Sequence, residues 1–162
     1  MEQTINVEHL PAGLYLVTTK NYKKNFLTQQ YKRSKPSIGE VTGKWEHLPY
    51  LSLKENVLLG VDKSRRAKLL TYIKLTEINP RIFTKQAKEL TQFDKIKLQF
   101  IHLLLKDVSV IYLYDCFSSL TVNQMQWILN FCRQLVQKYS LRILLFSKNE
   151  QLIQSTYMDE IF

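Results

Sequence analysis

The sequence predicts an α/β protein with a mostly parallel β-sheet, because two buried strands flank an amphipathic helix in its second half. The run Val108–Tyr114 (VSVIYLY) is β-branched and aromatic, which is typical of a strand buried on both faces. Leu141–Phe146 (LRILLF) is a second run of this kind. Between them, apolar residues at helical spacing form one face: Met125, Ile128, Leu129, Cys132, Leu135 and Val136. This order predicts a right-handed βαβ unit.

The first half predicts one more strand and several helices. Leu14–Val17 follows a Pro-Ala-Gly turn and is expected to be a short buried strand. A helix is expected over Phe26–Arg33, and Ser37–Glu40 is expected to be a turn. Ser52 and Glu55 have the spacing of a helix N-cap with an acid at the third helical position.

The middle and the end of the chain complete the expected set of helices. Helical patterns cover Arg65–Leu75 and Lys85–Lys106, with Pro80 between them. Thr121 and Gln124 predict a capping box for the helix that carries Met125. Glu150–Ser155 is expected to form a short helix.

Composition predicts a globular protein of one domain, residues 1–162. Hydrophobic residues make up 45% and charged residues 23%, and no apolar run is long enough to cross a bilayer. The start of the sequence has no secretory signal pattern, and its two cysteines are too few for a disulfide framework. These features predict a cytoplasmic protein.

The basic residues are unevenly distributed around a formal charge of +9. Between Thr18 and Lys44 there are seven bases and one acid, and between Lys63 and Lys88 there are eight bases and one acid. Such surfaces attract phosphates, nucleic acid or anionic membranes, although a solvated face that maintains solubility explains them equally well.

Motifs in the second half resemble those of ABC-transporter ATP-binding domains, which belong to the P-loop NTPases. Leu90–Asp94 (LTQFD) lies at the position of the family's signature loop, so Thr91 and Gln92 fall within it. Tyr114 falls where the family has the Walker B aspartate, and Asp115 where it has the catalytic glutamate. Lys148 takes the place of the switch histidine.

The first half follows the same pattern in the same order. Thr18–Asn25 (TTKNYKKN) lies over the Walker A phosphate loop, with Lys24 at the position of its lysine and Asn25 at that of its hydroxyl residue. Leu53–Gly60 (LKENVLLG) resembles the segment that enters the family's helical subdomain. The resemblance therefore implies a P-loop-NTPase-like, three-layer core with a reduced helical subdomain inserted at about residues 50–89. It also implies that the family's N- and C-terminal β elements are truncated.

The chemistry implied by the family is impaired at each of these positions. A phosphate loop needs glycines so that backbone N–H groups can converge on phosphate, yet Thr18 and Lys23 occupy the glycine positions. Tyr114 cannot supply a metal-binding carboxylate, and Lys148 cannot act as a neutral imidazole. The site residues Lys24, Asn25, Thr91, Gln92, Asp115 and Lys148 are therefore predicted to be vestigial.

The resemblance thus implies a catalytically inactive ABC-type subunit without a metal or other cofactor. Its expected partners are a transporter permease or a second ATPase subunit, with a homodimer also open, and a partner would place it at the membrane periphery. Two alternatives remain at this point: a divergent ATPase that still binds ATP and Mg²⁺, and a basic nucleic-acid-binding protein. Asp115 is also consistent with a simple cap on the turn that follows its strand, and Lys24 with a solvated lysine.

Overall fold

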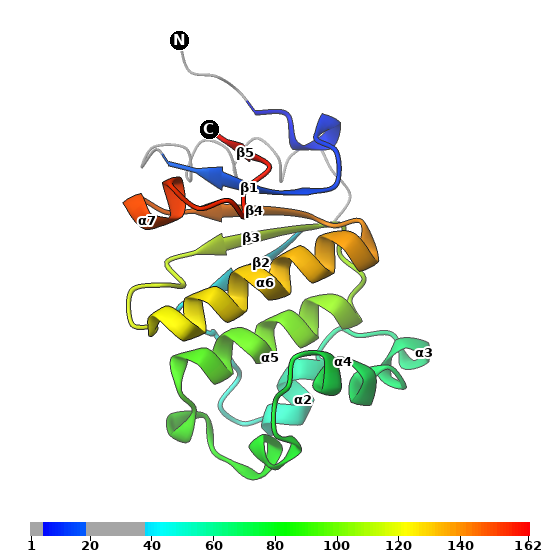
Figure 1. Ribbon diagram of the computed structural model, residues 1–162. Coiled ribbons are helices and arrows are strands. Elements are labelled where there is room, and N and C mark those ends of the chain that lie inside the picture. Colours follow the sequence, from blue (N-terminus) through cyan, green and yellow to red (C-terminus); the bar gives the residue numbers. More distant parts are fainter. Residues whose placement is uncertain (1–4, 19–37) are drawn as a thin grey trace.

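The computed structural model describes residues 5–18 and 38–162 (Figure 1). Its described residues form one five-stranded sheet in which all strands are parallel, in the order β2-β3-β4-β1-β5. The strand bounds are β1 Gly13–Val17, β2 Ile38–Thr42, β3 Val110–Tyr114, β4 Arg142–Phe146 and β5 Glu160–Ile161. The three predicted strands are confirmed, and so is the α/β class with a parallel sheet.

Helices connect the strands of this sheet. The α-helices are α2 Leu53–Leu58, α3 Lys63–Arg66, α4 Leu69–Leu75, α5 Gln92–Leu105, α6 Val122–Tyr139 and α7 Glu150–Ile153. The 3-10 helices are η1 Val7–His9, η2 Pro80–Thr84 and η3 Ala87–Glu89. The helix predicted over Phe26–Arg33 lies outside the described residues.

Capping boxes determine where three of these helices begin. The predicted boxes Ser52–Glu55 and Thr121–Gln124 are both present. A third box, Thr91–Asp94, starts α5 at Gln92, so the helix predicted from Lys85 was wrong in its first seven residues. The reciprocal bonds of this box satisfy backbone N–H groups that have no partner within the helix.

Two other predictions need correction. Ser37–Glu40 was predicted as a turn, but Ile38–Thr42 is a strand, and Gly39 serves there to let the side chain of Leu103 in α5 approach the backbone. The pattern Arg65–Leu75 is two helices, because a turn at Ala67 and Lys68 separates α3 from α4.

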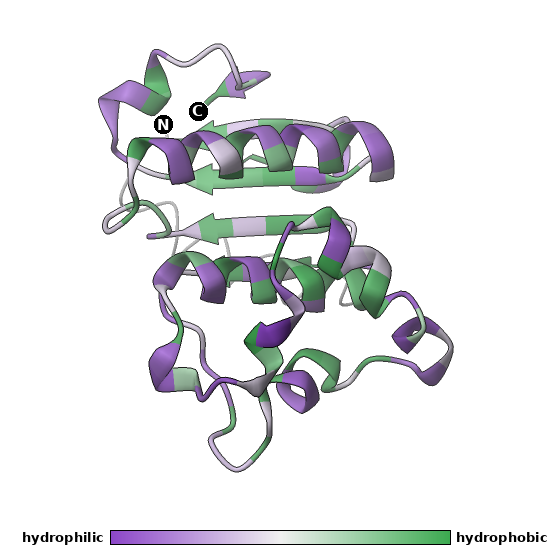
Figure 2. Cartoon of the chain, turned by 60° about the horizontal axis from the view of Figure 1, so that its bottom comes forward, coloured by the Kyte–Doolittle hydropathy of each residue, from purple (hydrophilic) through white to green (hydrophobic). Residues whose placement is uncertain are grey.

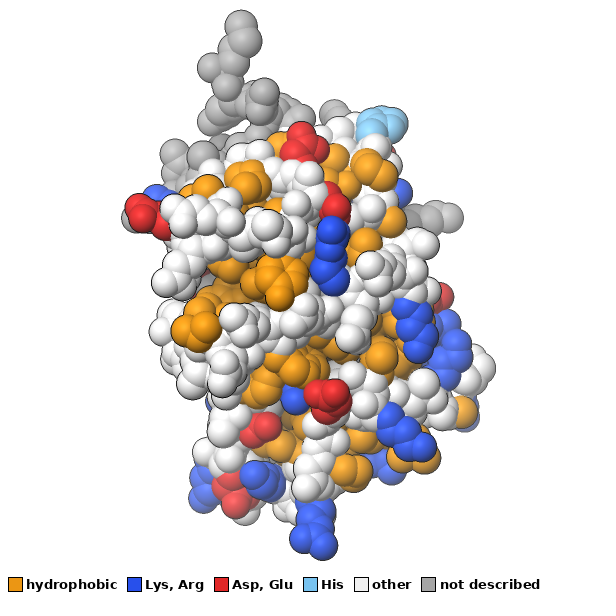
Figure 3. Space-filling model, viewed as in Figure 1, with side chains coloured by type: hydrophobic (Ala, Val, Ile, Leu, Met, Phe, Trp, Pro, Cys, Tyr) orange, Lys and Arg blue, Asp and Glu red, His pale blue; other side chains and the backbone are white. Residues whose placement is uncertain are grey.

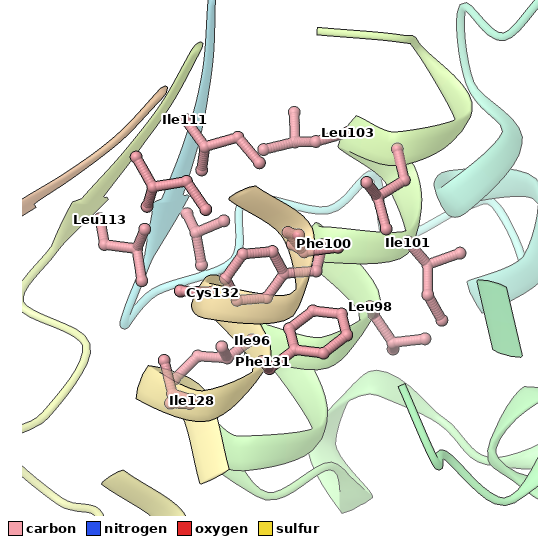
Figure 4. Packing of buried hydrophobic residues seen from close by; sticks show 14 of the residues in the cluster. Ile96, Leu98, Phe100, Ile101, Leu103, Ile111, Leu113, Ile128, Phe131 and Cys132 are labelled. Carbon is pink, nitrogen blue, oxygen red and sulfur yellow. The ribbon is translucent and has the colours of Figure 1, made fainter. Parts of the chain in front are cut away.

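The main core lies between the sheet and the pair α5 and α6, which run side by side over one face (Figures 1 and 2). Phe100 of α5 and Phe131 of α6 meet edge to face, with their ring centroids 5.2 Å apart (Figure 4). Ile111 and Leu113 of β3 supply the sheet side of this core. The hydrophobic stripe of α5 is thus part of the core.

The opposite face of the sheet carries mainly aromatic side chains. Tyr15, Tyr112 and Tyr114 are buried there, and Ile5 and Val7 from the start of the described chain pack with them. Alternate residues of β1, β3 and β4 therefore serve two separate cores, as the two-residue repeat of a β-strand requires.

Helices α2 and α4 pack against α5 on its side away from α6 (Figure 1). Arg65 of α3 donates from Nε to the carbonyl of Leu105 at 2.7 Å and from Nη2 to that of Leu104 at 3.3 Å. His102 of α5 bonds from Nδ1 to the carbonyl of Val57 in α2 at 2.8 Å. These contacts fasten the helices from α2 to α4 to the sheet-bearing part of the molecule.

Candidate functional site

A cavity of about 450 Å³ lies at the carboxyl ends of β1, β3 and β4. In a parallel sheet these ends lie along one edge, and ligand sites of α/β proteins form there. Three loops line the cavity: Val17–Thr18, Tyr114–Ser118 and Phe146–Asn149. Among the site residues predicted from the sequence, Asp115 and Lys148 both line it.

Asp115 follows β3 directly and has a left-handed backbone, with φ of 49°. This conformation costs a non-glycine residue about 1–2 kcal/mol. The turn after β2 lies against it, because a Cβ atom added to Gly43 would be 2.4 Å from the carbonyl oxygen of Asp115. The close approach of these two turns positions Asp115 at the cavity.

Tyr114 forms an aromatic wall beside the cavity. Its side chain is buried, and its ring centroid lies 4.5 Å from that of Phe146, at the end of the neighbouring strand β4. Tyr112 lies edge-on to both rings, with centroids 6.1 Å and 5.7 Å away. The motif resemblance implies a metal-binding aspartate at position 114. The side chain found there is instead a tyrosine ring packed against other aromatic rings.

Two of the polar residues that line the cavity make hydrogen bonds to other parts of the chain. The backbone N–H and the hydroxyl of Thr18 both donate to the carbonyl of Phe162, at 2.9 Å and 2.8 Å. Asn149 accepts from the backbone of Gln151 at 2.9 Å and caps α7. Thr18, the first residue of the predicted phosphate-loop segment, is thus hydrogen-bonded to Phe162. No local sequence pattern predicts this contact.

Thr91 and Gln92 do not line the cavity. They begin α5, where the Thr91 hydroxyl accepts from the backbone of Asp94 at 3.1 Å. The Gln92 amide lies over Gly43, since its nitrogen would be 2.7 Å from a Cβ atom added there. Gln92 and Asp115 therefore both lie close to Gly43, whereas Lys24 and Asn25 lie outside the described residues.

The cysteine in the cavity wall is a buried, hydrogen-bonded residue. The thiol of Cys116 donates toward the carbonyls of Val41 at 3.3 Å and Tyr114 at 3.2 Å. Burial raises the pKa of the second thiol, Cys132, in the core of α6. Both cysteines are free.

The described residues of the cavity are a poor fit for a nucleotide with its magnesium ion. Mg²⁺ prefers hard oxygen ligands, above all carboxylates. Among the described lining residues, Asp115 carries the only carboxylate. No group of three or more His, Cys, Asp or Glu side chains in residues 5–18 and 38–162 is arranged to hold a metal.

Comparison with solved structures identifies the fold. The chain superposes on CbiO1 from Clostridium perfringens, part of the ABC transporter complex CbiONQ, with a TM-score of 0.76. The two sequences are 14% identical, and the match covers 94% of this chain and 73% of the other. No protein-family model matches the sequence, and no curated protein matches it either.

Two further cassettes give the same result. The dimeric bacterial ABC transporter cassette MJ0796 matches with a TM-score of 0.72 at 14% identity, over 97% of this chain and 82% of the other. The ABC transporter cassette MJ1267 in its ADP conformation matches with a TM-score of 0.74 at 12% identity, over 94% and 76%. The chain thus has the fold of ABC-transporter ATP-binding cassettes, as the motif order predicted. Within its described part, no helix is long and apolar enough to span a bilayer.

Proposed function

We propose that this chain is a cassette-like protein that does not hydrolyse ATP and that acts as a partner-binding or regulatory subunit of a transporter. The observation that carries the proposal is the packing of Tyr114 against Phe146 at the carboxyl ends of two neighbouring strands. Phosphoryl transfer depends on metal ions that neutralise charge on the phosphates. A buried phenol ring supplies no such ligand.

The other end of the cavity supports the same proposal. Lys148 lies at the position where the resemblance implies a neutral, proton-accepting histidine. A lysine ammonium ion has three donors and no acceptor, so it cannot orient an attacking water in that way. Asp115 is then a base with no second carboxylate among the described residues that line the cavity.

The loop before α2 supports the partner-binding role. The Asn56 side chain accepts from the backbone of Leu48 at 2.7 Å and donates to the carbonyls of Leu48, Leu51 and Ser52. This network holds Tyr50 on the surface with 78% of its side chain exposed. A large aromatic residue on a rigid loop is a typical anchor for a protein partner.

Nucleotide turnover tests the first half of the proposal. Purified protein is incubated with ATP and Mg²⁺, and phosphate release is compared with that of the variant Asp115→Asn. We expect no Mg²⁺-dependent release from either protein, because the described lining residues offer a magnesium ion only one carboxylate. Hydrolysis by the wild type that Asp115→Asn abolishes would refute the proposal.

Calorimetry addresses the second candidate function, a divergent nucleotide-binding protein, which is favoured by the position of the cavity at the carboxyl ends of parallel strands. ATP is titrated into the protein with Mg²⁺ and with a chelator. Binding that needs Mg²⁺ and is lost in Lys24→Ala supports the second candidate. Absence of binding under both conditions supports the first.

Partner binding is tested with the native membrane fraction. We expect tagged protein to co-purify a permease or an ATPase subunit, identified by mass spectrometry. Tyr50→Ala should reduce recovery of that partner about tenfold or more if Tyr50 is an anchor. Ile153→Ala, which truncates an exposed apolar residue of α7, is the control and should leave recovery unchanged.

A further inference from the structure

The region around α3 and α4 has a surface that combines exposed bases with exposed leucines. We call it the α3–α4 surface, and its members are Leu59, Lys63, Arg66, Lys68, Leu70, Lys74 and Lys106, all of which are exposed. Figure 3 shows Lys and Arg side chains gathered at the lower right, where α3 and α4 lie, with hydrophobic side chains between them.

Contacts between its elements make this surface continuous. The Nζ atom of Lys106, just after α5, would be 3.9 Å from a Cβ atom on Gly60 in the turn before α3. Arg66 of α3 donates from Nε to the carbonyl of Val61 in the same turn at 3.1 Å. The turn, α3 and the end of α5 therefore share one side of the molecule.

The surface keeps a strong positive charge. From Lys63 to Thr76 the sequence has five bases and no acid. Asp107, an acid near Lys106, is paired with Arg65 at 3.1 Å. Asp62, at the N-cap of α3, is the acid that borders the surface. The net charge attracts an anionic partner over a distance of about one Debye length, roughly 10 Å at 0.1 M salt.

The two leucines of this surface are exposed to solvent. In α4, Leu69 and Ile73 are buried in the core, whereas Leu70 is 66% exposed and Lys74 lies one turn further along the same face. Leu59 is 49% exposed in the turn before α3. A surface that combines bases with apolar side chains suits a partner that offers both negative charge and an apolar layer.

We infer that the α3–α4 surface binds the face of an anionic lipid bilayer. The bases contact lipid phosphates and the two leucines enter the boundary between headgroups and acyl chains, which is the chemistry of interfacial membrane binding. Nucleic acid fits the surface less well, because leucine neither stacks on bases nor hydrogen-bonds to them. This contact is separate from the protein partner proposed above.

Vesicle sedimentation tests the inference with the full chain. The protein is mixed with extruded vesicles of phosphatidylcholine alone or with phosphatidylserine added. We expect sedimentation with the anionic vesicles only, and its loss between about 0.05 M and 0.5 M salt. The charge-reversal variant Lys63→Glu/Arg66→Glu/Lys68→Glu should lower the vesicle-bound fraction about tenfold or more.

The matched control is Arg81→Glu/Lys85→Glu/Lys88→Glu, which reverses three exposed bases outside the surface and changes net charge equally. It should bind as the wild type does, and circular dichroism checks that both variants fold. Equal loss in both triple variants would reduce the effect to net charge and overturn the inference.

Leu70→Ser separates lipid from nucleic acid. We expect it to weaken binding to anionic vesicles severalfold while the charge remains, because one inserted side chain is lost. Unchanged vesicle binding by Leu70→Ser would contradict the inference. So would binding of a labelled oligonucleotide, with no vesicle binding, that the charge-reversal variant abolishes.

Discussion

Gly39 lies in β2 where the helix α5 approaches the sheet most closely. A Cβ atom at this position would be 2.3 Å from Cδ2 and 2.8 Å from Cδ1 of Leu103, well inside van der Waals contact. Local sequence rules assign glycine to a turn, and here that assignment was wrong, because the need for glycine arises from a helix 64 positions further along the chain.

The first prediction follows from this contact. Gly39→Ala should destabilise the protein by about 1–3 kcal/mol, because the leucine must leave its preferred rotamer or the strand must shift. In a Leu103→Ala background the same change should cost much less. Urea unfolding of the wild type, Gly39→Ala, Leu103→Ala and the double variant gives the coupling energy between the two positions. Strictly additive losses of stability would show that the two side chains do not interfere.

His102 links α5 to α2 and is partly buried. Burial lowers the pKa of His102, an effect that its bond to Val57 opposes and the nearby Lys106 reinforces. As pH falls below about 6.5, the His102 imidazole is therefore protonated in the unfolded chain before it is protonated in the folded protein. Stability linked to His102 is unaffected above that pH and decreases through the window below it, until the folded state is protonated as well.

The second prediction is a pH-dependent loss of stability that this histidine causes. Between about pH 7.5 and pH 5.5, the unfolding free energy of the wild type should fall more than that of His102→Gln. His9→Gln replaces an exposed histidine and should follow the wild type. Parallel profiles for the wild type and His102→Gln would exclude His102 as the source of the effect.

At the scale of elements, Arg65 closes the carboxyl end of α5. The last carbonyls of a helix lack partners within the helix and carry its negative dipole end, so a guanidinium group there supplies both hydrogen bonds and charge. Because α3 is a separate four-residue helix, its arginine can reach α5 while α4 packs into the core.

The third prediction concerns this cap. Arg65→Ala should lower the unfolding free energy by about 1.5–3 kcal/mol, the range for hydrogen bonds to charged groups. Asp107→Asn removes the charge of the exposed ion pair and keeps a residue type that tolerates the left-handed backbone at this position (φ 58°), so it should cost less than about 1 kcal/mol. Chemical denaturation measures both, and an equal loss in the two variants would assign the effect to the ion pair instead of the helix end.

Element boundaries were predictable where their signals are local. The boxes at Ser52 and Thr121 involve residues three positions apart, so the sequence alone revealed them. The box at Thr91 has the same spacing, yet the apolar pattern extended past it and led to a helix that was too long. In this case a local capping signal was more informative than hydrophobic periodicity.

At the scale of the whole molecule, Asp159 joins the end of the described chain to its beginning. Its Oδ2 atom accepts from the backbone of Leu14 at 2.8 Å and from Arg133 of α6 at 2.6 Å. Burial alone raises the pKa of Asp159, but these two partners outweigh it and hold the pKa below its ordinary value. The carboxylate therefore stabilises the fold above about pH 4, and this contribution is lost as pH falls through its lowered pKa.

The fourth prediction tests this clamp. Asp159→Asn should lower the unfolding free energy by about 1 kcal/mol near neutral pH, a value kept small because solvent screens the half-exposed pair. The difference between wild type and variant should vanish in strong acid. Hydrogen exchange at the Leu14 amide should accelerate in the variant, and unchanged exchange would show that the carboxylate does not hold this strand.

Some contacts of the candidate site could be predicted from local sequence patterns, and others could not. Asp115 and Lys148 could be predicted as neighbours, because each follows a strand-like run and parallel strands end at one edge. The pairing of Thr18 with Phe162 could not, because the two residues are 144 positions apart and β5 is only two residues long. So short a strand leaves no periodic pattern in the sequence.

Local patterns by themselves determined the strands β1, β3 and β4, the helix α6 and the parallel sheet, since apolar runs and helical spacing are properties of neighbouring residues. Only the tertiary structure decided that Tyr114 packs against Phe146, that Arg65 ends α5 and that Asp159 holds β1. Each of these contacts joins residues far apart in the chain, and their geometry exists only after the sheet and its helices have assembled. Local sequence patterns do not encode such distances.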